Sequence, residues 1–163
     1  MTITTAAIAP DLFRALLRRH AAGVVVVTAA AGRPAGFTAT SFTSVSLDPP
    51  LVSFCLARSS SSWPVVEAAA HIGVHVLAER QAALATTFAT SGIDRFAAPL
   101  NWHYGDFGVP VLDEAHAVLV CRVERLVHAG DHAIVLAEPV HASAGTVPVP
   151  PLVYHDGQYL RAA

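Results

Sequence analysis

The stretch from Gly36 to Ser62 reads GFTATSFTSVSLDPPLVSFCLARSSSS and combines a short apolar strand with two clusters of hydroxyl side chains. One cluster, Thr38 to Ser46, precedes the apolar strand, and the other, Ser59 to Ser62, follows it. Hydroxyl groups and free backbone N–H groups at a strand edge can bind a phosphate. A β-branched strand between them offers a flat wall for an aromatic ring. The stretch therefore predicts a site for a phosphorylated aromatic cofactor.

Hydroxyl side chains fall on both faces of the strand expected within Gly36–Ser46. Strand alternation places Thr38 and Thr40 on one face and Ser41 on the other. An edge strand rich in threonine and serine is the structural alternative. The segment Arg58–Ser62, one strand later, favours phosphate binding, because its hydroxyls, its backbone N–H groups and one arginine suit an anion.

Outward from this stretch, the chain shows many short strands and few helices. Strands are expected at Val24–Thr28, Gly36–Ser46, Leu51–Ala57, His71–Leu77, Ala115–Val127, Ala133–Val140, Leu152–Tyr154 and Gln158–Leu160. Helices are expected from Asp11, as N-cap, to about His20, from Trp63 to Ala70 and from Arg80 to Thr90. This pattern predicts a mainly β fold with flanking helices, an antiparallel barrel. A parallel βαβ sheet is the weaker alternative, since several connections are too short for crossovers.

Length and composition bound the class of protein. The 163 residues suit one domain, and 53% of them are hydrophobic. The longest nearly apolar run, Ala21–Ala31, is too short to span a bilayer, so we expect no membrane association. The high hydrophobic fraction indicates a subunit interface. The alternative explanation is the alanine-rich composition, since alanine raises this fraction while adding little apolar area. A net charge of −2 argues against a nucleic-acid partner.

Cysteine usage and the first residues indicate a cytoplasmic protein. Cys55 and Cys121 lie far apart in apolar, strand-like segments, which favours free thiols over a disulfide. The segment Met1–Phe13 lacks the positive region and the long apolar core of a secretion signal.

Several catalytic patterns are missing from the sequence. It contains no G-x-S-x-G, H-E-x-x-H, G-x-x-x-x-G-K-[ST] or strand-following G-x-G-x-x-G motif. His71 and His75 are four residues apart, but they belong to an expected strand and lack a third ligand, so no metal site is predicted. His132 follows Gly130-Asp131 at a hairpin tip, where it is either solvated or a mobile contact for a second substrate.

Five segments, in order, resemble the short-chain flavin reductases, the small partners of two-component flavin-dependent monooxygenases. They read GFTATSFTSVSLDPPLVSFCLARSSSSWP, HIGVHVLAERQAALATTFA, IDRFA, PVLDEAHAVLVCRVERLVHAGDHAIVLAEPV and PLVYHDGQYLR. The likeness covers nearly the whole chain after His20. It implies one flavin reductase-like domain over residues 1–163, with an N-terminal helical segment (1–20) and a split β-barrel (21–163). It also implies a homodimer with flavin near the subunit interface.

The resemblance also implies which residues meet the cofactors. Flavin ring and ribityl contacts are expected from Thr38, Ala39, Thr40, Ser41 and Phe42, and backbone contacts to the ring from Ser53, Phe54 and Cys55. Phosphate contacts are expected from Ser59, Ser60, Ser62 and Arg95, with Phe96 near the cofactor and His132 at the nicotinamide. Ser61 stands where the family often has a basic residue, and Arg95 stands where lysine is more usual.

The implied function is an NAD(P)H:flavin oxidoreductase. Hydride would pass directly from NADH or NADPH to FMN or FAD, so no acid–base pair or nucleophile is expected in the protein. The reduced flavin would go to a partner monooxygenase. One alternative is a flavin carrier or sensor without reductase turnover. Another is an oxidase on the same barrel that acts on a pyridoxal-type phosphate.

Overall fold

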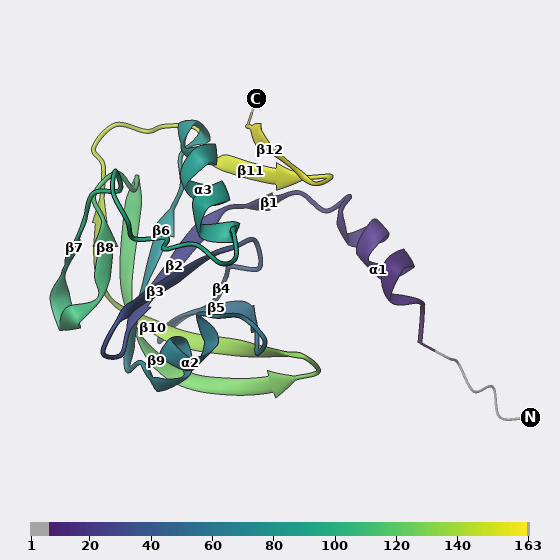
Figure 1. The fold of residues 1–163 in the computed structure, drawn as a ribbon, viewed down its shortest axis with the longest axis horizontal. Coiled ribbons are helices and arrows are strands. Elements are labelled where there is room, and N and C mark those ends of the chain that lie inside the picture. The colour runs from purple at the N-terminus through teal and green to yellow at the C-terminus, as the bar shows by residue number, and fades with distance from the viewer. Residues whose placement is uncertain (1–6, 163) are drawn as a thin grey trace, which may run out of the picture.

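The computed structural model describes residues 7–162. The helices are α1 (Pro10–Leu17), α2 (Trp63–Ala68) and α3 (Ala82–Ala89), with 3-10 turns η1 (Glu79–Gln81) and η2 (Asp106–Gly108). The first strands are β1 (Ala22–Gly23), β2 (Val25–Ala30), β3 (Pro34–Ala39), β4 (Thr43–Leu47), β5 (Pro50–Ala57) and β6 (His71–Val76). The remaining strands are β7 (Trp102–Tyr104), β8 (Pro110–Leu112), β9 (Ala117–Ala129), β10 (His132–Ala144), β11 (Leu152–His155) and β12 (Gln158–Arg161). Figure 1 shows these elements, with α1 standing away from the body of the molecule.

One large antiparallel sheet dominates the fold. Its strand order is β3-β2-β6-β9-β10-β5-β4, and all of its neighbouring strands pair antiparallel. A small sheet, β1-β11-β12, and the β7–β8 hairpin lie beside it. The prediction of a mainly β, antiparallel fold is confirmed, and the parallel βαβ alternative is wrong.

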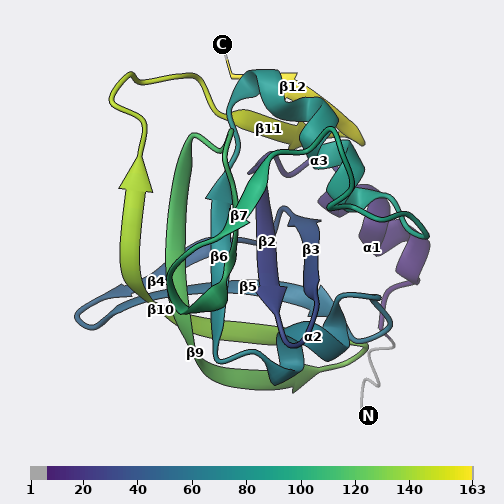
Figure 2. The ribbon, with the colours of Figure 1, turned by 60° about the vertical axis from the view of Figure 1, so that its left-hand side comes forward.

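The large sheet curls, because a short link joins its two opposite edges. Only Thr40, Ser41 and Phe42 separate β3 from β4, and four residue steps span at most about 14 Å. Figure 2 shows β2, β3 and β6 upright while the long β9 and β10 bend beneath them. Register shifts in the β9–β10 ladder, at Leu136/Ala137 and Pro139/His141, accompany that bend. The single strand expected over Gly36–Ser46 is therefore wrong, since its two halves pair with different strands.

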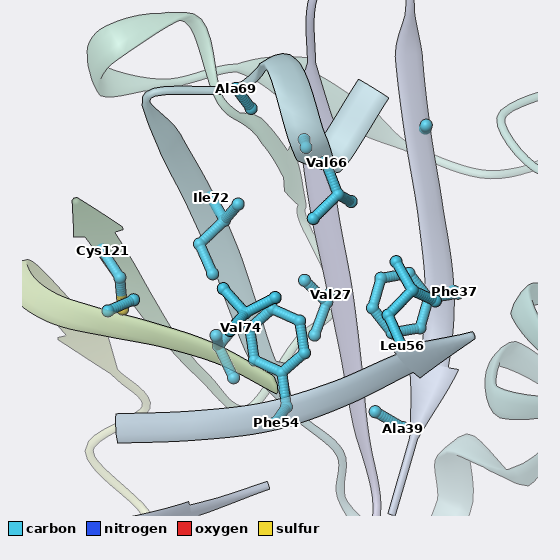
Figure 3. Packing of buried hydrophobic residues seen from close by; sticks show 14 of the residues in the cluster. Val27, Phe37, Ala39, Phe54, Leu56, Val66, Ala69, Ile72, Val74 and Cys121 are labelled. Carbon is cyan, nitrogen blue, oxygen red and sulfur yellow. The ribbon is translucent and has the colours of Figure 1, made fainter. Parts of the chain in front are cut away.

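Strand β2 is buried on both faces, which explains its nearly continuous valine sequence. Val25 and Val27 face the main core, whereas Val26 faces a second cluster beneath α3 that includes Phe88. Figure 3 shows side chains of the main core, including Val27, Phe37, Phe54, Ile72 and Val74, gathered between the folded parts of the sheet. Because one strand serves two cores, β2 ties α3 to the sheet.

Other expectations need smaller corrections. Helix α1 begins at Pro10, with Ala9 as N-cap, so the expected N-cap Asp11 lies inside the first turn and pairs with Arg14 at 3.2 Å. The segment between α3 and β9 contains the β7–β8 hairpin, which was not among the expected strands. Within residues 7–162, the helices lack the length and hydrophobicity needed to cross a bilayer.

His75 connects three parts of the fold from a fully buried position in β6. Its Nδ1 lies 3.1 Å from the Val26 carbonyl oxygen of β2, and its Nε2 lies 3.1 Å from the backbone N–H of Leu112 in β8. This pattern requires the neutral ring, with Nδ1–H donating and Nε2 accepting. Burial lowers the pKa of His75 from 6.5 to about 4, which agrees with that geometry.

His75 should make the protein less stable in acid. The unfolded chain binds a proton at this histidine below about pH 6.5, while the folded chain resists protonation down to about pH 4. The free energy of unfolding should therefore fall as the pH drops through this window, by up to about 3 kcal/mol from this residue. Urea unfolding across the window should reveal the loss. In the His75→Gln variant the free energy of unfolding should depend less on pH, whereas the exposed variant His20→Gln should keep the wild-type dependence. An unchanged pH dependence in His75→Gln would contradict the role assigned to His75.

Candidate functional site

A hollow of about 570 Å³ lies where β3, the end of β5, the following serine loop (residues 58–62) and the end of α3 meet. Its apolar wall consists of Phe37, Leu56, Ala57, Phe88 and Ala89. Its polar side consists of Thr38, Ser59, Ser60, Ser61, Arg95 and His132, joined by Cys55 and by Ser91 and Gly92 after α3. The hollow thus has an apolar wall beside a group of hydroxyls and one arginine, as small-molecule sites commonly do.

The serine loop has backbone N–H groups that donate to no backbone carbonyl among residues 7–162. The N–H of Ser60 donates to the Ala57 carbonyl, and the N–H of Trp63 donates to the Ser60 carbonyl, both at 3.0 Å. Within residues 7–162, the N–H groups of Ser59 and Ser61 donate to no backbone carbonyl. Both residues line the hollow, so their N–H groups are available to phosphate oxygens.

Arg95 supplies the positive charge of the site. Its Nε donates to the Thr90 carbonyl at 2.9 Å, and its Nη1 donates to the Gly36 carbonyl at 2.6 Å and lies 3.3 Å from Ser62 Oγ. These bonds hold the guanidinium in place and leave further N–H donors for an anion. Partial burial lowers the pKa of Arg95, yet a guanidinium remains charged near neutral pH.

Arg58 has a different role from the one expected. Its Nη2 donates to the Gly130 carbonyl at 2.6 Å, and its backbone N–H donates to the Asp131 carbonyl at 3.0 Å. Arg58 does not line the hollow. The expectation that the arginine of the serine loop accompanies the phosphate is therefore wrong, since this side chain instead ties the loop to the β9–β10 turn.

His132 lines the same hollow from the start of β10, opposite Ala57 in the strand register. Its Nδ1 lies 2.6 Å from Asp131 Oδ1, and its side chain is about half exposed. The hydrogen bond and the charge of His132 lower the pKa of Asp131. The tertiary fold thus brings the hairpin-tip histidine to the serine loop, about seventy residues earlier in the chain.

Two of the predicted hydroxyl groups, those of Thr38 and Ser41, form hydrogen bonds at the sheet edges. Thr38 Oγ1 donates to the Ala85 carbonyl of α3 at 2.6 Å, which fixes the helix over β3. Ser41 Oγ accepts the Cys55 N–H at 2.8 Å. The β4–β5 ladder begins at the pair Thr43–Ser53, so Ser41 replaces a missing strand partner for Cys55. The Thr38 oxygen retains a lone pair and lines the hollow.

The other expected site residues lie in varied surroundings. Phe54 and Ala39 are buried, with their side chains in the main core, so only their backbones could approach a ligand from this strand edge. Phe42 packs against that core, Thr40 is exposed and Ser53 is half-buried within β5. Ser62 is buried, with its Oγ donating to the Gly36 carbonyl at 3.0 Å. Ser62 and Phe96 line an adjoining hollow instead.

Several lining residues were absent from the sequence prediction. Phe37 and Phe88 form part of the apolar wall, and Ser91 and Gly92 follow α3. Gly92 has a φ of +77°, a conformation that favours glycine. The glycine turn between α3 and Arg95 was therefore a sequence signal that could have pointed to this part of the hollow. No local signal marks Phe88, because α3 reaches the hollow only through its packing on β2 and β3. Ser61 contributes through its backbone, so the missing basic side chain does not remove it from the site.

The geometry fits a phosphorylated aromatic ligand. The free N–H groups and Arg95 suit the phosphate. The side chains of Phe37, Leu56 and Phe88 are buried in the two cores, so a ring system would meet mainly the backbone of these residues and the half-buried Ala57. Among residues 7–162, no group of three or more His, Cys, Asp or Glu side chains is arranged to hold a metal ion.

Comparisons with known proteins identify the family of the chain. The family model of the flavin reductase like domain matches residues 17–163. The chain is 47% identical over 153 residues to the NADH:FMN oxidoreductase of Rhodococcus qingshengii, covering 91% of this chain and 80% of that protein. It is 33% identical to the reductase subunit of a flavin-dependent monooxygenase from Mycobacterium tuberculosis, covering 95% and 83%.

A solved structure matches over nearly the whole length. It is the NADH:FAD oxidoreductase of Streptomyces globisporus in complex with NAD and FAD fragments, with a TM-score of 0.88 and 32% identity. The match covers 98% of each chain. Since the family model covers most of the sequence and these relatives align over most of their own lengths, the protein belongs to the family of the flavin reductase like domain.

Proposed function

We propose that this protein is an NAD(P)H:flavin oxidoreductase that reduces FMN or FAD and supplies the reduced flavin to a partner monooxygenase. The observation that carries the proposal is the serine loop, whose free Ser59 and Ser61 N–H groups face the same hollow as Arg95. These donors suit a terminal phosphate in a chain whose net charge is −2. The Mycobacterium tuberculosis relative, named as a monooxygenase reductase subunit, supports the partner.

The residues of the hollow bind and orient the reactants. Ser59, Ser60, Ser61 and Arg95 would hold the flavin phosphate, while the wall formed by Leu56 and its neighbours would lie against the ring. The Ser41–Cys55 hydrogen bond fixes the strand edge beside the ring. A bound flavin and a reduced nicotinamide would themselves supply the hydride chemistry, so the protein needs no acid–base pair or nucleophile. The apolar wall excludes water and aligns the two rings.

We assign His132 to the nicotinamide. Its half-exposed ring stands at the rim of the hollow, held by Asp131 on one nitrogen. Arg58 secures the backbone just before His132 through the carbonyls of Gly130 and Asp131. A ring held there can contact a second substrate without touching the flavin phosphate. Reduced nicotinamide and the unpaired Cys55 and Cys121 both suit the reducing cytoplasm, where we place the reaction.

We further propose a homodimer, with the curled sheet of each protomer as a split barrel. Helix α1 buries none of its residues, and its apolar side chains are about half exposed: Leu12, Phe13, Leu16 and Leu17. Further exposed apolar side chains lie on β4, β9 and β10: Val45, Leu47, Val127, Ile134 and Val140. Apolar surface of this extent typically marks a protein–protein contact. A second copy would cover it and narrow the open side of the hollow.

The function is tested by nicotinamide oxidation. The purified protein should oxidise NADH or NADPH only when free FMN or FAD is added, followed at the nicotinamide absorbance band. No turnover with any of the four combinations would contradict the reductase. A tightly held yellow chromophore that reduced nicotinamide cannot bleach would favour the carrier alternative instead.

Ser59→Asp should weaken FMN binding by about tenfold or more, since a carboxylate would face the phosphate. Calorimetric titration with FMN and with riboflavin, which lacks the phosphate, provides the measurement. Riboflavin affinity should change little, and the exposed variant Ser143→Asp should behave as wild type. Equal weakening of both ligands would mean that the serine loop does not hold the phosphate.

His132→Ala should raise KM for the nicotinamide about fivefold to tenfold, because the ring contributes one contact at the rim. The Kd for FMN should stay within about twofold of wild type. Steady-state kinetics and a separate flavin titration measure the two effects, with exposed His141→Ala as the matched control. Parallel loss of flavin affinity would place His132 at the flavin instead.

Size-exclusion chromatography with light scattering should give twice the 17.0 kDa of one chain. Leu16→Glu together with Leu17→Glu should shift the protein toward the monomer, because charges would then lie in the apolar contact. The exposed polar variant Arg19→Glu should leave the mass unchanged. A wild-type mass of one chain would contradict the dimer.

A further inference from the structure

Arg58 is the first residue of the serine loop and lies one step beyond the end of the β5–β10 ladder. The last pair of that ladder is Ala57–His132. The backbone N–H of Arg58 donates to the Asp131 carbonyl at 3.0 Å, so the pairing continues for one further hydrogen bond. The Arg58 side chain therefore starts beside the turn that carries His132.

The Arg58 side chain adds a contact that the ladder does not provide. Its Nη2 donates to the Gly130 carbonyl at 2.6 Å. Its positive charge also acts on Asp131, whose pKa is lowered first by the hydrogen bond and charge of His132 and, to a smaller degree, by Arg58. Arg58 thus interacts with both of the residues that precede His132.

Packing contributes little to this turn between β9 and β10. Gly130 has a φ of +62°, and a Cβ at this position would meet no heavy atom of residues 7–162 within 4 Å apart from its neighbours in the chain. The side chain of Asp131 is 93% exposed and that of His132 is 47% exposed. Because few packed contacts fix the turn, its hydrogen bonds largely decide where the His132 ring lies.

We propose that Arg58 is a positioning residue for the nicotinamide. Through Gly130 and Asp131, it holds the His132 ring at the rim of the hollow. Arg58 does not itself line the hollow, so it acts without touching either cofactor. Asp131 Oδ1 lies 2.6 Å from His132 Nδ1, which leaves Nε2 for the second substrate. This inference rests on the proposed function, in which His132 contacts the nicotinamide.

The test is a double-mutant cycle in steady-state kinetics of the full-length chain at saturating FMN, with NADH or NADPH, whichever the wild type oxidises faster. Arg58→Gln removes the charge and the bond to Gly130, while the backbone bond to Asp131 remains. It should raise KM for the nicotinamide about threefold to fivefold and leave kcat within about twofold. In the His132→Ala background it should raise KM no further, because Arg58 acts through that ring, whereas independent effects would multiply.

Two further variants and a flavin titration serve as controls. Arg58→Lys keeps the charge and one donor group, so it should recover part of the loss in KM. Arg161→Gln, which removes an exposed arginine on β12, should leave KM unchanged. The Kd for FMN of Arg58→Gln, measured by calorimetry, should stay within about twofold of wild type, which also shows that the variant folds.

Three results would overturn this role and leave the proposed function intact. An unchanged KM in Arg58→Gln would show that the side chain does not position His132. A parallel rise in the Kd for FMN would assign Arg58 to the serine loop as a whole. Effects that multiply in the double variant would show that Arg58 acts independently of the ring.

Failure of the proposed function has different signs. An unchanged KM in His132→Ala would contradict the assignment of the nicotinamide, and the role of Arg58 with it. A wild-type protein that oxidises no nicotinamide in the presence of flavin would contradict the reductase itself.

Discussion

The short link between β3 and β4 is the constraint on which the rest of the structure depends. The two strands are the opposite edges of one seven-stranded sheet, and only Thr40, Ser41 and Phe42 join them. The sheet must therefore curl until its edges approach each other. Curling encloses the main core on one side, and it brings β3 beside the end of β5, where the candidate site lies. Because the two edges approach without forming a ladder, backbone groups such as the Cys55 N–H need other partners, and Ser41 supplies one.

The candidate site depends on backbone geometry more than on side-chain charge. One arginine and two serine residues whose N–H groups donate to no backbone carbonyl among residues 7–162 line the hollow, in a chain with a net charge of −2. Oriented N–H dipoles can stabilise an anion without a basic surface. Arg58 makes the serine loop and the β9–β10 turn one connected unit, through its bonds to Gly130 and Asp131. The serine loop and the backbone just before His132 are therefore linked directly by hydrogen bonds.

Much of the fold could be predicted, because hydrophobic alternation is a local property. The strands around Leu51–Ala57 and His71–Leu77 appear nearly as expected. The short connections β2–β3, β4–β5 and β9–β10 explain the antiparallel pairing of those neighbouring strands. The division of Gly36–Ser46 could not be predicted, since both halves have strand-like sequence and only the curled sheet shows that one half pairs with β2 and the other with β5, at opposite edges. The same holds for the short β7–β8 hairpin, which His75 helps to anchor through Leu112.

For the site, the sequence by itself determined the hydroxyl-rich stretch, the serine loop and the histidine at the hairpin tip, because these are features of residue type and spacing. The tertiary structure decided which of them meet. It placed Arg95 rather than Arg58 in the lining of the candidate hollow, brought buried Phe88 of α3 against it and set Arg33 beside a second hollow. The physical reason is that a chain segment specifies its own conformation, whereas a binding surface forms only when the packing of distant strands and helices brings side chains together.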